Sequence, residues 1–188
     1  ARGLVSSSDL VSVARPYMVK LLDTFGETVN LGKLVGDDII FLHIEETAHQ
    51  FRYVDNVGDR ASLHSTAIGK AICAFRPDAD LGKMLTDYEF TRFTRHSITS
   101  LEDFNQQMLN VREQGFALDN EEGTPGVVCI AVPVFDESYR SNSAISISMP
   151  KIRSNRKLVR EIQEELPKIG VQMSIDMGVT DIRKCFNY

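Results

Sequence analysis

Two pairs of strand patterns, each joined by a loop, constrain the fold of this chain more than any other feature. Thr28 to Leu34 and Ile39 to Glu45 flank the turn Gly36-Asp37-Asp38 and therefore predict a hairpin. Phe116 to Leu118 and Val127 to Phe135 flank an acidic, glycine-rich loop. Hairpins join antiparallel neighbours, so the sequence predicts an α+β fold with a mostly antiparallel sheet and no strict strand-helix repeat.

Further elements are expected around these hairpins. Phe51 to Val57 is a candidate third strand, ended by Gly58-Asp59. Ser143 to Ser148 is a strand that places Ser146 and Ser148 on one face. Helices are expected where a capping residue precedes apolar residues at helical spacing. Their expected starts are Ser8 or Asp9, Ser65 or Thr66, Asp80, Ser100, and Ser154 or Asn155.

Composition limits the class of protein. The chain has 188 residues, of which 43% are hydrophobic and 25% charged, as expected for one globular domain. It has no apolar run of membrane-spanning length and no signal-peptide core, so a cytoplasmic location is expected. A net charge of -5 argues against a nucleic-acid surface on this chain. Three cysteines without C-x-x-C spacing argue against a disulfide framework or a zinc knuckle.

The stretch from Leu63 to Phe75 is the first candidate binding site. Ser65 or Thr66 is placed to cap a helix whose first turn holds small residues, including Ala67 and Gly69. The free N–H groups of such a helix start attract a carboxylate or phosphate. The alternative is an ordinary capped helix that only packs against the core, and the spacing alone favours this alternative.

Two later segments supply polar groups. The acidic loop after Phe116 to Leu118 can place a carboxylate at the mouth of a pocket, although such a loop is more often a solvated turn. The two hydroxyls of Ser146 and Ser148 can donate to a ligand carboxylate, although a polar strand face usually meets water.

Three segments also carry a family resemblance. The first comprises His64, Thr66, Ala67, Gly69, Lys70 and Ala71. The second comprises Gly115, Phe116, Ala117, Asp119, Glu121, Glu122, Gly126, Cys129, Ile130, Ala131, Pro133 and Val134. The third comprises Ala144, Ile145, Ser146, Ile147, Ser148 and Pro150. In this order they resemble the effector-binding domain of IclR-type bacterial transcriptional regulators, and the likeness covers roughly Asp9 to Met173.

The resemblance implies a GAF-like fold over residues 1–188 and a ligand-sensing function without enzyme activity. It implies an effector pocket formed by the backbone N–H groups of Ala67 and Ile68 and the side chains of Asp119, Cys129, Ser146 and Ser148. The expected ligand is a small organic acid. The family also implies dimers or tetramers, and operator DNA bound only through a winged helix-turn-helix domain that this chain lacks. Met149 stands where the family usually has glycine, so the sequence leaves the pocket size, and with it the size of the effector, open.

Other functions remain open from the residues alone. Cys129 as nucleophile, His64 as base and Asp119 as orienting group would make a Cys-dependent enzyme. A structural dimerisation module without a ligand is another alternative. No metal site is predicted, because the histidines lack ligand spacing, and no cofactor or membrane partner is expected.

Overall fold

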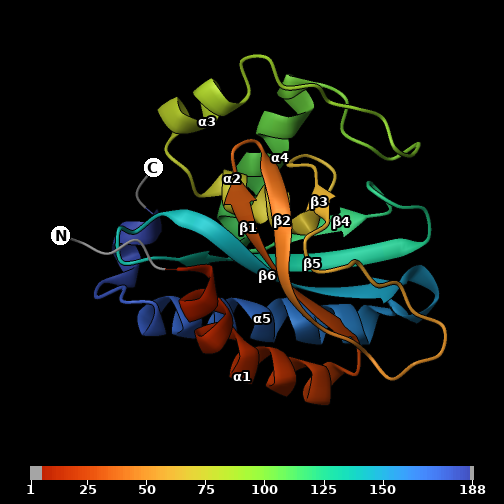
Figure 1. The fold of residues 1–188 in the computed structure, drawn as a ribbon. Helices are drawn as coiled ribbons and strands as arrows, with labels where there is room; N and C mark the ends of the chain where they lie inside the picture. Colours follow the sequence, from red (N-terminus) through yellow and green to blue (C-terminus); the bar gives the residue numbers. More distant parts are fainter. Residues whose placement is uncertain (1–5, 187–188) are drawn as a thin grey trace.

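The fold is built on a six-stranded antiparallel sheet, in a computed structural model that describes residues 6–186 (Figure 1). Residues 1–5 and 187–188 of the expected 1–188 domain lie outside the described residues. The strand order is β3-β2-β1-β6-β5-β4. The strands are β1 (Thr28–Val35), β2 (Asp38–Glu45), β3 (Arg60–Ala61), β4 (Ala117–Asn120), β5 (Val127–Phe135) and β6 (Ser141–Pro150). Both predicted hairpins, β1–β2 and β4–β5, are confirmed.

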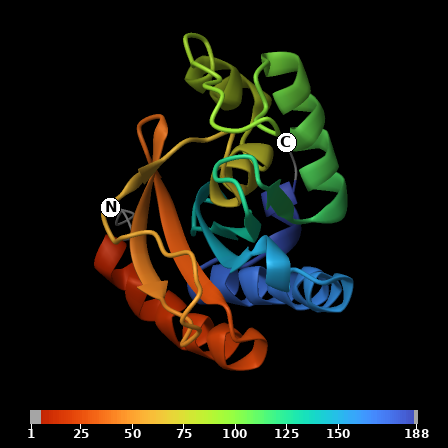
Figure 2. The same cartoon turned by 90° about the vertical axis from the view of Figure 1, so that its right-hand side faces the viewer.

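Helices cover both faces of the sheet, as the two views show (Figures 1 and 2). Helices α1 (Ser7–Phe25) and α5 (Arg156–Asp176) pack on one face, and α2 (Ala67–Ala74) packs on the other. Helices α3 (Asp78–Met84) and α4 (Leu101–Gln114) lie outside α2. Two short 3-10 helices, Lys151–Arg153 and Ile182–Phe186, flank α5. Two apolar cores therefore form, one on each face of the sheet, and the expected α+β, GAF-like architecture is confirmed.

Local signals fix the ends of the helices. Ser6 caps α1 in a capping box with Asp9, and Gly26 ends it with a φ of 71°. Ser100 caps α4, and its hydroxyl oxygen accepts a hydrogen bond from the Asp103 N–H at 3.1 Å. The side chain of Asn155 caps α5 in the same way. The predicted helix starts are therefore correct to within about two residues.

The predicted strand at Phe51 to Val57 is wrong. This segment runs between β2 and β3 without regular structure, and the side chains of Phe51 and Val57 are 70% and 61% exposed. The chain turns back at Asn56 and Asp59, where the Asp59 N–H donates to the Asn56 carbonyl at 3.0 Å. Gly58 and Asp59 then bond to the backbone of Phe41, so the sheet is extended by the short strand β3 instead.

Met149 does not line the cavity described below. Met149 is fully buried in the core between the sheet and helices α1 and α5. Because side chains alternate along β6, Ser146 and Ser148 point to the opposite face, towards α2.

Among residues 6–186, no helix combines the length and apolar character that crossing a bilayer requires.

Candidate functional site

The start of α2 presents backbone donors to a cavity. Thr66 is the N-cap, and its hydroxyl oxygen accepts a hydrogen bond from the Gly69 N–H at 3.0 Å. The Thr66 carbonyl accepts from the Lys70 N–H at 3.1 Å. Within the described part of the chain, the N–H groups of Ala67 and Ile68 have no assigned acceptor, as expected for the first turn of a helix. Both residues line the cavity, so their N–H groups are available to a ligand.

Glycines allow the neighbouring chain to approach this helix closely. A Cβ atom on Gly69 would overlap the backbone of Leu63, and one on Gly32 of β1 would lie 2.9 Å from the Ile68 side chain. A Cβ atom on Gly123 would lie 2.8 Å from the Ser65 carbonyl oxygen. The helix start is therefore held tightly between β1 and the loop that joins β4 to β5.

The cavity has a volume of about 210 Å³ and lies between the start of α2 and the sheet. The structure brings all six residues predicted for the site to its wall. These are Ala67, Ile68, Asp119, Cys129, Ser146 and Ser148. Further polar residues that line it are Asn30, Tyr53, Asp55, Arg60, Ser62, Ser65, Thr66 and Thr124.

Three adjacent strands supply one polar wall. In the sheet register Asn30 of β1 lies opposite Ser146 of β6, and Ser148 lies opposite Cys129 of β5. The Asn30 amide donates to the Ser148 hydroxyl at 2.8 Å and to the Ser146 hydroxyl at 3.4 Å. The Ser148 hydroxyl donates to Cys129 Sγ at 3.1 Å. Asn30 is only 1% exposed, yet its Oδ1 atom has no hydrogen-bond partner among the described residues.

Asp119 places a carboxyl group beside this wall. Burial, with a smaller contribution from the nearby Glu122 carboxylate, raises the pKa of Asp119 to about 7. The Glu122 N–H donates to Asp119 Oδ1 at 2.7 Å and fixes the carboxyl group. Near neutral pH this carboxyl group is therefore present in both protonation states and can accept or donate a hydrogen bond.

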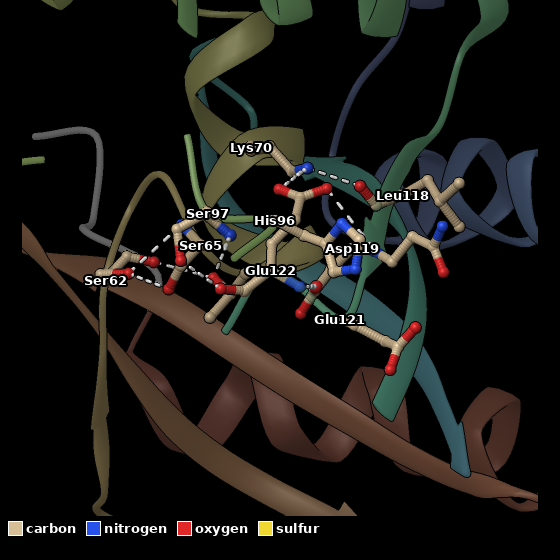
Figure 3. Close-up of polar contacts among 12 residues, drawn as sticks. Ser62, Ser65, Lys70, His96, Ser97, Leu118, Asp119, Glu121 and Glu122 are labelled. Carbon is tan, nitrogen blue, oxygen red and sulfur yellow. Dashed lines mark hydrogen bonds and ion pairs between the residues drawn. The ribbon is translucent and has the colours of Figure 1, made fainter. Parts of the chain in front are cut away.

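A buried ion pair holds the loop that follows Asp119 and strand β4. Lys70 of α2 is fully buried, and its Nζ atom lies 2.5 Å from Glu122 Oε2 and 2.5 Å from the Leu118 carbonyl oxygen (Figure 3). From the other side, the Ser97 hydroxyl donates to the Glu122 carbonyl at 2.7 Å. The loop is thus fixed both by α2 and by the segment before α4, and Asp119 is fixed with it.

Among the wall residues that the sequence did not predict are Asn30, Tyr53 and Asp55. Asn30 carried a signal, because a polar residue between Val29 and Leu31 in a strand interior is unusual. Tyr53 and Asp55 lie in the segment that was predicted as a strand, and no pattern in it indicates a cavity wall.

The geometry does not form the catalytic group of a Cys-dependent enzyme. His64 is absent from the cavity wall, and its ring nitrogens are occupied by the Tyr88 hydroxyl at 2.7 Å and the Thr91 carbonyl at 2.9 Å. Burial raises the pKa of the Cys129 thiol well above its ordinary value, and the nearby Asp119 adds to this rise. A neutral thiol without a free base is a poor nucleophile. Residues 6–186 also contain no group of three His, Cys, Asp or Glu side chains placed to hold a metal ion.

Comparison with known proteins agrees with this architecture. The model of the family described as bacterial transcriptional regulator IclR, C-terminal, matches residues 2–175. The HTH-type transcriptional regulator BhcR of Paracoccus denitrificans is 36% identical over 171 residues, covering 91% of this chain and 61% of that protein. The regulator KdgR of Escherichia coli is 36% identical over 173 residues, covering 92% of this chain and 66% of that protein. The chain therefore spans less than two thirds of these relatives.

Solved structures give the same result. The C-terminal domain of E. coli KdgR aligns with a TM-score of 0.82 at 35% identity, covering 90% of this chain and 99% of that one. The Thermotoga maritima IclR aligns with a TM-score of 0.87 at 28% identity, covering 90% of this chain and 69% of that one. These relatives are transcriptional regulators, which confirms the prediction that the chain is not an enzyme. The chain belongs to the IclR family of bacterial transcriptional regulators and represents its C-terminal, effector-binding domain.

Proposed function

We propose that the cavity at the start of α2 binds a small organic acid and that this acid is the effector of the regulator. One observation carries the proposal: donor groups without an assigned acceptor among the described residues converge on one cavity. They are the N–H groups of Ala67 and Ile68 and the hydroxyl hydrogen of Ser146. A carboxylate accepts several such hydrogen bonds at once, and the helix dipole favours its negative charge.

The remaining predicted residues fit this assignment. The Ser148 hydroxyl holds the Cys129 thiol in place and lies beside Ser146 on the same face of β6. Asp119 accepts a hydrogen bond from a hydroxyl or hydrate on the ligand, and Cys129 offers a soft, weakly polar contact. Among the described residues, Arg60 is the one cation on the cavity wall, but its side chain is 71% exposed and pairs with Asp38 at 2.7 Å. The acid is therefore held mainly by neutral donors.

In the full regulator, the effector would act through the arrangement of the subunits. We infer that operator DNA is bound by a winged helix-turn-helix domain outside this chain, in a cytoplasmic dimer or tetramer without a cofactor. An acid can shift such an assembly only if it binds one arrangement more tightly than the other. The acid would bias the position of the residues around the cavity. The main such segment is the loop between β4 and β5, which the Lys70–Glu122 ion pair fixes to α2.

A thermal-shift screen against keto acids, sugar acids and aromatic acids tests the proposal. A ligand that binds only the folded state at 100 times its Kd stabilises that state by about 2.7 kcal/mol, which is readily detected as a rise in Tm. Ser146→Ala should reduce the rise, because it removes one donor from the carboxylate. Ser143→Ala is the matched control, since Ser143 lies on β6 outside the cavity wall and donates to the Val134 carbonyl.

Two results would contradict the proposal. If no acid raises Tm at millimolar concentration, the domain is better described as a dimerisation module without a ligand. If an acid raises Tm equally in the wild type and in both serine variants, it binds elsewhere and the site assignment is wrong.

A further inference from the structure

The cavity wall also carries hydrogen-bond acceptors that the protein leaves unused. The available donors are the N–H groups of Ala67 and Ile68 and the hydroxyl group of Ser146, which together suffice for one carboxylate. Asn30 Oδ1 is a buried acceptor without a donor among the described residues. The Asp55 carboxylate accepts from the Tyr53 hydroxyl at 2.9 Å, and Asp119 accepts from the Glu122 N–H at 2.7 Å and from the backbone of Gly123. A carboxylate has about four acceptor positions, so both retain unused capacity.

The Tyr53–Asp55 pair is held over the cavity by its own segment of chain, residues 46–59. At one end, Arg153 donates to the Phe51 carbonyl at 2.7 Å while it pairs with the nearly buried Glu27. At the other end, Gly58 donates to the Phe41 carbonyl of β2 at 2.8 Å. Tyr53 and Asp55 lie between these two anchors and line the cavity. Contacts with the rest of the fold therefore fix the segment on both sides of this pair.

The hydrogen bond between Tyr53 and Asp55 leaves Asp55 as the acceptor of the pair. No cation among the described residues pairs with Asp55, and burial raises its pKa above the ordinary value. Burial, with the nearby Asp55 carboxylate, raises the pKa of Tyr53 to about 12, so this residue remains a phenol that donates to Asp55. An acid without hydroxyl groups would leave the buried Asn30 Oδ1 without a donor and the free acceptor positions of Asp55 unfilled, which is unfavourable.

We propose that the effector is a hydroxy acid with at least two hydroxyl groups, and that Asn30 and the Tyr53–Asp55 pair select it by accepting hydrogen bonds from those hydroxyls. This inference rests on the proposed function, because the carboxylate of the same molecule occupies the donors at the start of α2. It adds a specificity-determining segment, residues 46–59, to the predicted site. A site built to accept from a ligand hydroxyl discriminates strongly against an analogue that lacks it.

Matched pairs of acids test this inference. Glycerate with propionate and gluconate with hexanoate differ in their hydroxyl groups at equal carbon number. Titration calorimetry should give each hydroxylated acid that binds a Kd at least about tenfold lower than that of the hydroxyl-free acid of equal carbon number. The reason is that each acceptor left unpaired weakens binding by roughly a factor of ten. In Asp55→Leu, which keeps a similar shape without acceptors, this preference should fall at least about tenfold while the hydroxyl-free acid binds equally or better. Tyr53→Phe should weaken the preference in the same direction.

Glu46→Gln is the matched control, because Glu46 lies on the same segment but is exposed and pairs with Arg52 at the surface. It should leave both affinities unchanged. Equal binding of hydroxylated and hydroxyl-free acids, sensitive to Ser146→Ala but not to Asp55→Leu, would overturn this inference and leave the proposed function standing. Absence of binding by all four acids, or binding insensitive to Ser146→Ala, would overturn both.

Discussion

The buried carboxyl group of Asp119 should make the stability of this domain depend on pH in an unusual direction. The pKa of Asp119 rises from 3.8 to about 7 on folding, mainly because of burial. Between these two values the folded chain retains a proton that the unfolded chain has released, so stability falls as pH rises. At about 1.4 kcal/mol per pH unit, the full loss between pH 4 and pH 7 is about 4 kcal/mol.

Asp119→Asn isolates this effect. Asparagine is neutral at every pH, and its side-chain oxygen can still accept from the Glu122 N–H. Urea unfolding of the wild type and the variant at pH 5, 6, 7 and 8 gives the difference in free energy of unfolding at each pH. Asp119→Asn should become more stable relative to the wild type by about 3 kcal/mol between pH 5 and pH 8. Other titrating groups, such as the buried His64, cancel in this difference.

Asp87→Asn is the control for the chemical change itself, since it replaces an exposed aspartate that lies outside the cavity wall. A constant difference between wild type and Asp119→Asn from pH 5 to pH 8 would refute the reasoning. It would mean that the carboxyl group ionises equally readily in the folded and unfolded chains.

Three further perturbations test the packing around the cavity. Lys70→Met should lower the free energy of unfolding, measured with urea, by about 3–5 kcal/mol because Glu122 loses its cation in a largely buried site. The double variant Lys70→Met, Glu122→Gln should recover much of this loss, because it also removes the unpaired charge. Gly69→Ala should destabilise the domain and move the start of α2, since its Cβ would overlap Leu63; an unchanged Tm would contradict the close approach. The three cysteine thiols have raised pKa values, so Ellman's reagent at pH 7.5 should label them slowly in the native protein and rapidly in denaturant. Rapid native labelling would show that a thiol is exposed and ionised.

The sequence predicted those parts of the fold that local chemistry determines. Caps such as Ser100, and a stop such as Gly115 with a φ of 81°, act within a few residues, so helix ends could be located. The alternation along β6 correctly placed Ser146 and Ser148 on one face, because side-chain direction in a strand follows from sequence position alone. The grouping of the six site residues around one cavity came from the family resemblance, since no local rule brings α2, β4, β5 and β6 together.

The parts that could not be predicted depend on contacts between distant residues. Phe51 to Val57 has strand-like composition, but Arg153 and the backbone of Phe41 hold it as a segment beside the cavity. The role of Met149 depended on which face of the sheet it meets, and its neighbours in α1 and α5 are far away in sequence. The pKa of Asp119 is likewise set by burial and by Glu122, which only the folded chain reveals.

The most direct test of the central claim is to observe the amide groups of Ala67 and Ile68 by NMR while an acid that raises Tm is added. A carboxylate bound at the start of α2 should shift these two amide protons downfield and slow their exchange with solvent, with saturation at one acid per chain. Amide protons that stay unchanged while others saturate would place the acid elsewhere and contradict the account.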